Sequence, residues 1–221
     1  VLQQCYNIAD TLIVGQCIGA GALAAVGSAY TLMVFLISVL LGLAMGSGTV
    51  FSLHYGAGNH VALRRSIFSS FVLIGIVTLI LNVAVFIWLD PILRLLQVPQ
   101  DIYGMMRSYL WIIFCGIVFT FIYNFYASLL RAVGDSVTPL WFLAVSVVLN
   151  IALDLFFILQ LDWGIQGAAA ATVLAQGVAA LGIIIYTYRR RPELRWHHED
   201  MCFDRTCLKE IASFSTLTCI Q

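Results

Sequence analysis

The stretch "LWFLAVSVVLNIALDLFFILQL", Leu140–Leu161, decides the fold because it is long and apolar and yet contains an acid. A helix needs about 20 mainly apolar residues to cross about 30 Å of hydrocarbon, so this run is long enough to span a bilayer. Of the 221 residues, 62% are hydrophobic and 10% are charged, and the mean hydropathy is +0.98. Because soluble domains are far less apolar, the composition predicts an integral membrane protein.

Further runs of the same kind predict an all-α bundle of membrane-spanning helices. The complete runs are Ala22–Leu53, Ile67–Leu89, Met105–Leu130, Leu140–Leu161 and Gly164–Tyr188. Short segments rich in Gly, Pro, Asn and Asp separate these runs and predict loops. Val1–Ile18 has no initial Met, no basic leader and several polar residues. We therefore interpret it as the tail of another span and not as a signal peptide.

The basic residues fall mainly on one side of the predicted topology. Only Arg94 and Arg107 lie on the other side. If Val1–Ile18 is counted as part of the first helix, the other basic residues follow the second, fourth and sixth helices. They are Arg64, Arg65, Arg131, Arg189, Arg190, Arg191, Arg195, Arg205 and Lys209. Positively charged loops of membrane proteins face the cytoplasm. We therefore expect a cytoplasmic linker at residues 189–208, followed by the start of a seventh helix at residues 209–221.

Two acids, Asp10 and Asp154, fall inside predicted spans, where no Lys or Arg lies deep enough to neutralise them. A charged side chain at the centre of a span costs roughly 3 kcal/mol or more, so each acid should hold a proton or coordinate a cation. Asn150 lies four residues before Asp154 and therefore on the same helix face, where the two can share a ligand. Alternatively, Asn150 and Asp154 only form a hydrogen-bonding pair between helices.

Small residues recur at helical spacing and predict close packing between helices. The pairs Gly15–Gly19 and Gly42–Gly46 have GxxxG spacing, and Ala168–Ala171 gives one side of its helix a very small profile. Backbones can approach closely at such positions, and interhelical contacts in membranes depend on that approach. We expect these residues to pack and not to contact substrate.

The sequence resembles the multidrug and toxic compound extrusion (MATE) family in five stretches that occur in order along the chain. These are "YNIADTLIVGQCIGAGALAAVG", "YGAGN", "LLRAVGDSVTPL", "LNIALD" and "GIQGAAAATVLAQ". The resemblance implies two six-helix lobes around a central cavity, with residues 1–188 as one lobe whose first helix is truncated. It also implies that the second lobe lies outside this chain.

The resemblance further implies an exporter of drugs or toxic organic cations in the cell membrane, driven by inward Na⁺ or H⁺ and using no organic cofactor. The family's cation site corresponds here to Asp10, Asn150, Asp154 and Thr172, with Tyr109 and Asn124 as further polar residues that face the lobe interior. Carboxylate, amide and hydroxyl oxygens are the hard ligands that a small cation prefers.

Two other classes of function remain as alternatives. A flippase for lipid-linked or polysaccharide precursors would need basic groups for phosphate, and the spans lack deep Lys or Arg. An intramembrane enzyme or assembly subunit is the other, but the sequence has no nucleophile–His–acid set, phosphate-binding Gly loop or HExxH motif. The spacing of His197, His198, Cys202 and Cys207 fits zinc patterns poorly. We interpret these four residues as part of a solvated linker, and the basic residues near them as a membrane anchor and not a nucleic-acid site.

Overall fold

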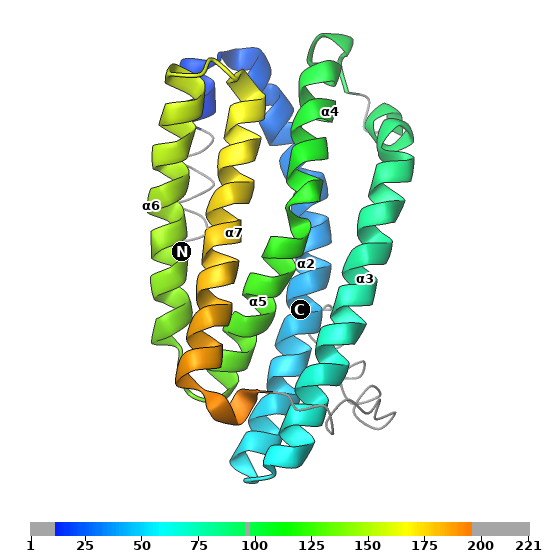
Figure 1. Cartoon of the computed structure of the whole chain (residues 1–221). Coiled ribbons are helices and arrows are strands. Elements are labelled where there is room, and N and C mark those ends of the chain that lie inside the picture. Colours follow the sequence, from blue (N-terminus) through cyan, green and yellow to red (C-terminus); the bar gives the residue numbers. More distant parts are fainter. Residues whose placement is uncertain (1–11, 96–97, 196–221) are drawn as a thin grey trace. The chain divides into compact units, whose positions relative to one another are not determined.

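The computed structural model describes residues 12–95 and 98–195, and the elements found in that part of the chain are helices (Figure 1). Residues 12–17 are helical. The longer helices that follow are α2 (Ala20–Gly56), α3 (His60–Leu95), α4 (Gln100–Cys115), α5 (Ile117–Ala132), α6 (Val137–Leu159) and α7 (Gly164–Arg190). The short 3₁₀ helix η1 (Pro192–Leu194) comes after α7. The prediction of an all-α membrane protein is confirmed.

Four helices, α2, α3, α6 and α7, are long and apolar enough to cross a membrane. The pair α4 and α5 forms a fifth candidate span, with a bend of 45° between the two helices. These five spans correspond to the five complete runs in the sequence. The run Met105–Leu130, predicted as one continuous helix, is instead interrupted at Gly116.

The helices extend beyond the apolar runs that predicted them. Much of the expected loop after α2 is helical, because α2 continues to Gly56 and α3 begins at His60. At its other end α3 continues through Pro91 to Leu95. An apolar run marks only the part of a helix that lies in hydrocarbon, whereas polar side chains can be solvated farther along the same helix. Asp90, expected in a loop, lies on α3 and accepts hydrogen bonds from Arg107 Nε at 2.9 Å and the Tyr103 hydroxyl at 2.8 Å.

The contacts divide the chain into two compact units. Unit 1 contains the described residues up to Phe35, together with Ile80–Phe119 and Leu143–Ala179. Unit 2 contains Leu36–Leu79, Thr120–Phe142 and the described residues from Ala180 onward. The long helices α2, α3, α6 and α7 each contribute one segment to either unit, so each unit is itself a small helical bundle.

Aromatic rings and small residues form the core of unit 2. The ring of Phe125 lies 5.9 Å from that of Phe51 and 5.2 Å from that of Phe71, measured between centroids. The Ser128 hydroxyl donates to the carbonyl oxygen of Ala44 at 2.7 Å. A Cβ atom at Gly48 would lie 2.4 Å from the Ser128 Oγ and would displace the hydroxyl from this hydrogen bond. A buried hydrogen bond between α5 and α2, at a point where the two helices lie close together, thus stabilises unit 2.

In unit 1, small residues have two different roles. Ala168, Ala169 and Ala171 are fully buried on α7, as expected for a helix side that packs closely. Gly19, expected to form a GxxxG packing pair with Gly15, instead has a φ of +113° and separates the helical residues 12–17 from α2. Glycine adopts positive φ at little cost because it has no Cβ. The pair therefore marks a helix boundary and not a continuous packing face.

Asp135 caps the start of α6 and links it to the end of α7 within unit 2. One carboxylate oxygen accepts from the backbone N–H of Thr138 at 3.0 Å, and the other accepts from the Thr138 hydroxyl at 2.8 Å. The second oxygen also accepts from the Tyr186 hydroxyl at 3.3 Å and lies 3.9 Å from the Arg191 guanidinium. Burial raises the pKa of Asp135, but these hydrogen bonds and the Arg191 charge outweigh it and hold the pKa below its ordinary value of 3.8.

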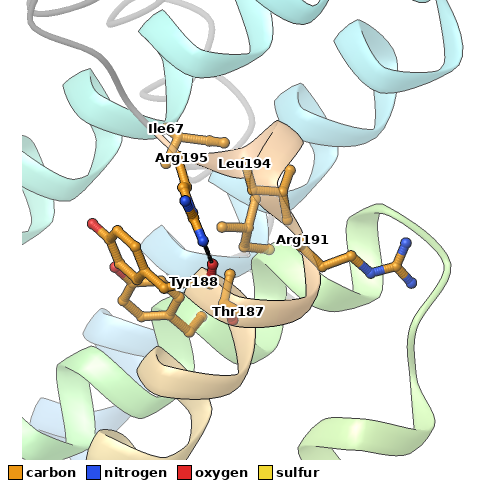
Figure 2. Close-up of a pocket in the computed structure, with 8 residues that line it drawn as sticks. Ile67, Thr187, Tyr188, Arg191, Leu194 and Arg195 are labelled. Atoms are coloured by element: carbon orange, nitrogen blue, oxygen red, sulfur yellow. Dashed lines mark hydrogen bonds between the residues drawn. The ribbon is translucent and has the colours of Figure 1, made fainter.

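The start of the predicted linker belongs to unit 2 and lies beside a pocket of about 240 Å³, open solvent included. The guanidinium of Arg195 donates to the carbonyl oxygen of Tyr188 and so satisfies the last turn of α7. Arg191 points away from Arg195 (Figure 2) and lies 3.5 Å from Glu193. The pocket is lined by Ile67, Tyr126, Leu129, Thr187, Tyr188, Arg191, Leu194 and Arg195. Because both arginines have oxygen partners within the protein, we interpret this pocket as a gap between packed side chains and not as a binding site.

Replacing Asp135 tests its role as the N-cap of α6. We expect Asp135→Ala to lower the free energy of unfolding by about 1–2 kcal/mol at neutral pH, as for other lost N-caps. Because the pKa is lower in the folded protein, the charge of Asp135 stabilises fully above about pH 4, and this contribution is lost as the pH falls through the folded value. Thermal unfolding in detergent from pH 3 to 7 measures both effects. Asp135→Asn keeps a capping oxygen and cannot titrate, so an acid loss equal to wild type in this variant would contradict the assignment.

Candidate functional site

The candidate site is built on α6, which buries Ser146, Asn150 and Asp154 at four-residue spacing. Asn150 and Asp154 are both fully buried, with 0% of each side chain exposed. They are four residues apart and so lie on one face of the helix. Val148 and Phe156 lie on other faces and are 69% and 50% exposed. Helix α6 therefore presents its apolar residues outward, as to lipid, and buries its amide and its acid within the protein.

Helix α7 supplies the third polar residue of the site. Thr172 is 6% exposed and lies beside the fully buried Ala168, Ala171 and Ala175. These small side chains let the backbone of α7 come close to its neighbours. The amide nitrogen of Asn150 donates to the Thr172 hydroxyl at 3.3 Å. Asn150, Asp154 and Thr172 thus form one buried group, which we call the Asn150 cluster.

The Asn150 amide has a second orientation that satisfies both of its ends. Rotated by 180°, its nitrogen donates to Asp154 Oδ2 at 3.2 Å and its oxygen accepts from the backbone N–H of Thr172 at 3.3 Å. Amide nitrogen and oxygen exchange places in this rotation, so hydrogen-bonding partners decide between the two orientations. An ionised Asp154 only accepts hydrogen bonds, and it therefore favours the orientation in which Asn150 donates to it.

The other predicted site residues have different positions. Tyr109 is buried on α4 of unit 1, the unit that contains the Asn150 cluster. Asn124 is buried in unit 2, where its nitrogen donates at 2.8 Å to the carbonyl oxygen of Thr120 on its own helix. Asp10 lies outside the described residues. The structure therefore brings together three of the four predicted cation ligands and leaves the fourth untested.

A conventional metal site is absent from the part of the chain that the structure describes. No three His, Cys, Asp or Glu side chains among these residues are placed to hold a metal ion. The unusual zinc candidates His197, His198, Cys202 and Cys207 lie outside the described residues. A cation at the Asn150 cluster would therefore depend on amide and hydroxyl oxygens as well as on a carboxylate.

Sequence reasoning missed a further, partly buried polar contact at the interruption between α4 and α5. The side-chain nitrogen of Asn82 on α3 donates to the carbonyl oxygen of Phe114 at 2.7 Å. Asn82 lies in the apolar run "LILNVAVF", and an amide inside a membrane span normally has a partner within the protein. That isolated amide was the available signal, but the sequence alone does not say which helix it contacts.

The chain is similar to a family of known proteins over most of its length. The MatE family model matches residues 1–156. The chain belongs to the MatE family. The probable multidrug resistance protein YpnP of Bacillus subtilis (strain 168) is 36% identical over 190 residues, which cover 86% of this chain and 43% of that protein. The probable multidrug resistance protein YoeA of the same organism is 33% identical over 200 residues, covering 89% of this chain and 43% of that protein.

A solved MatE relative has the same fold. The inward-facing conformation of a multidrug resistance MATE family transporter of the MOP superfamily matches with a TM-score of 0.92 and 25% identity, covering 99% of this chain and 50% of that chain. This chain spans about half the length of the relatives that it matches. The resemblance to the MATE family and the fold of one lobe are confirmed. Asn150 and Asp154 fall within the matched range 1–156, whereas Thr172 lies beyond it.

The Asn150 cluster should contribute to stability even without a bound cation. We expect Asn150→Ala to lower the free energy of unfolding by about 1–2 kcal/mol, because it leaves buried partners of the amide unsatisfied. Unfolding in detergent micelles measures the change. Ser146→Ala is the matched control, since Ser146 is a buried polar residue one turn earlier on α6. An equal loss in the two variants would show that the amide contacts contribute nothing specific.

Proposed function

We propose that the chain is one lobe of a secondary active transporter that exports drugs or toxic organic cations. In this proposal a second lobe of similar size completes the transporter, and Na⁺ or H⁺ entering the cell drives export. The names of the relatives YpnP and YoeA describe probable multidrug resistance proteins, which supports the substrate class. The observation that carries the mechanism is Asp154, an acid fully buried on a membrane-spanning helix beside Asn150.

Cation binding and proton binding would have the same effect on the Asn150 amide. The amide atom that faces Asp154 Oδ2 lies 3.2 Å from it. When Asp154 is ionised and empty, the NH₂ group occupies this position. When Asp154 holds a proton or a cation, the amide oxygen is the favoured neighbour, because it can accept the proton's hydrogen bond or coordinate the cation. Occupancy of the site therefore selects the orientation of Asn150.

Rotation of the amide also changes which atom of α7 it contacts. In the orientation for an empty site, the amide oxygen accepts from the Thr172 backbone N–H. In the orientation for an occupied site, the amide nitrogen can donate to the Thr172 hydroxyl at 3.3 Å, but it also faces the Thr172 backbone N–H, so this orientation requires an occupied Asp154 to be favoured. A ligand drives a conformational change only if it binds the two conformations with different affinity. This exchange of contacts is a source of such a difference, and Asp10 is the proposed second carboxylate of the same site.

Replacing Asp154 tests the coupling directly. We expect Asp154→Asn in the full-length transporter to preserve folding and membrane insertion, because the volume hardly changes and an intramembrane charge is removed. Efflux of a fluorescent organic cation should lose its dependence on the Na⁺ and H⁺ gradients. Asp10→Asn should have the same effect, and the double variant should be little worse than either, because the two act as one unit.

The exposed acid Asp162 provides the matched control for this experiment. It lies in the loop after α6 and has a φ of 51°, a conformation that asparagine also tolerates. Asp162→Asn should leave efflux and its gradient dependence unchanged. Gradient-dependent efflux at the wild-type rate in Asp154→Asn would overturn the proposed mechanism.

The proposed orientation places the loop between α2 and α3 and the linker after α7 in the cytoplasm. In a variant whose native cysteines are replaced, His60→Cys should react with a membrane-impermeant thiol reagent only after the membrane is opened. Asp162→Cys should react in intact cells, because it lies in the loop on the opposite side. The reverse labelling pattern would invert the topology.

A further inference from the structure

We infer that Gly116, Asn82 and Val173 form a hinge that couples occupancy of the Asn150 cluster to the bend between α4 and α5. This inference rests on the proposed function, because the cluster must bind a cation for the hinge to respond to it. All three residues belong to unit 1, as does the Asn150 cluster. Gly116 lies where α4 ends and α5 begins, and the two helices differ in direction by 45°.

Gly116 is needed at this position for space and not for backbone conformation. Its φ of −85° and ψ of −8° are accessible to any residue. A Cβ atom here, however, would lie 2.4 Å from Cγ2 and 2.9 Å from Cγ1 of Val173 on α7. A valine in a helix has one strongly preferred side-chain rotamer, so Val173 cannot turn away easily. The bend and α7 are therefore in direct contact with no spare room.

Asn82 stabilises the interrupted form of α4 and α5. The N–H of Gly116 donates to the carbonyl oxygens of Ile112 at 3.3 Å and Ile113 at 2.9 Å, which tightens the last turn of α4. The carbonyl oxygen of Phe114 accepts from Asn82 at 2.7 Å. A backbone carbonyl at membrane depth needs a partner within the protein. The Phe114 carbonyl oxygen also accepts from a backbone N–H at the C-terminus of α4, so Asn82 adds a side-chain donor to the interrupted form.

The connection to the Asn150 cluster runs through two adjacent residues of α7. Thr172 contacts the Asn150 amide through its hydroxyl in one amide orientation and through its backbone N–H in the other. Val173 is the next residue and touches Gly116. A small shift of α7 at Thr172 therefore moves the side chain that fills the space at the bend. Because the residues at the bend are closely packed, they cannot accommodate such a shift without moving. The bent form therefore favours either the empty or the occupied state of the Asn150 cluster.

Transport assays on the full-length protein test the contact with Val173. We expect Gly116→Ala to change the cation concentration for half-maximal efflux by at least about fivefold, the lower range of allosteric couplings. Adding Val173→Ala should bring the value back toward wild type, because it removes both Cγ atoms. Gly104→Ala is the matched control, since a Cβ at Gly104 on the same helix meets nothing within 4 Å. If Gly116 has only a structural role, Gly116→Ala will lower expression or the maximal efflux rate without changing the cation concentration for half-maximal efflux.

Distance measurements test the bend itself. Spin labels at Met105→Cys and Arg131→Cys, in a variant whose native cysteines are replaced, report the separation across Gly116. We expect added Na⁺ or lowered pH to shift this distance in the wild type and not in Asp154→Asn. Asn82→Leu removes the side-chain donor to the Phe114 carbonyl and should lengthen the distance without added cation. Thr78→Val is its control, because the Thr78 hydroxyl donates only to the Ile74 carbonyl of the same helix, at 2.7 Å.

The outcomes separate this inference from the proposed function. If Asp154→Asn keeps wild-type gradient dependence, the proposed cation site fails and the hinge has no ligand to respond to. If Asp154→Asn loses that dependence while Gly116→Ala and Asn82→Leu keep wild-type half-maximal concentrations and wild-type distance shifts, the cation site stands and the hinge is overturned.

Discussion

The constraint on which the rest of the structure depends is the absence of water in the hydrocarbon part of a bilayer. Every polar group there must find its partner within the protein. The few polar side chains on otherwise apolar helices therefore decide which helix faces turn inward. Ser128 reaches the Ala44 carbonyl oxygen, Asn82 reaches the Phe114 carbonyl oxygen, and Asn150 reaches Thr172. Each of these contacts joins two different helices, and apolar packing without direction could not specify them.

Close packing follows from the same constraint, because short polar side chains can reach a partner only when the helices nearly touch. The glycines that permit this approach are recognisable only by the residue that faces them. A Cβ atom at Gly48 would strike Ser128, and one at Gly182 would lie 2.6 Å from the Phe142 ring. Glycine at these positions thus has a steric reason. The spacing of glycines along one helix carries no information about the opposing helix, and so GxxxG patterns alone did not find these contacts.

The sequence predicted the membrane class, the five spans and the pairing of Asn150 with Asp154, because length, hydropathy and helical periodicity depend on local sequence alone. Thr172 was predicted only through the resemblance to a family, since no local rule assigns α7 to a face of α6. The interruption at Gly116 escaped prediction because apolar residues flank it on both sides and the residue that packs against it, Val173, lies on another helix. Asn124 was expected to face the lobe interior and is buried, but its amide bonds to its own helix. That choice between local and distant partners depends on tertiary packing.

In the proposed mechanism, the Asn150 cluster places a buried acid beside an amide that can rotate. The two orientations of the amide exchange one contact with Thr172 at 3.3 Å for another at 3.3 Å. With Asp154 ionised, only the rotated orientation satisfies both ends of the amide. The state of Asp154 then decides, because a carboxylate attracts the NH₂ group whereas a proton or bound cation attracts the amide oxygen. A buried acid beside a rotatable amide therefore suits ion coupling better than a fixed ion pair, whose partner would hold Asp154 in one state.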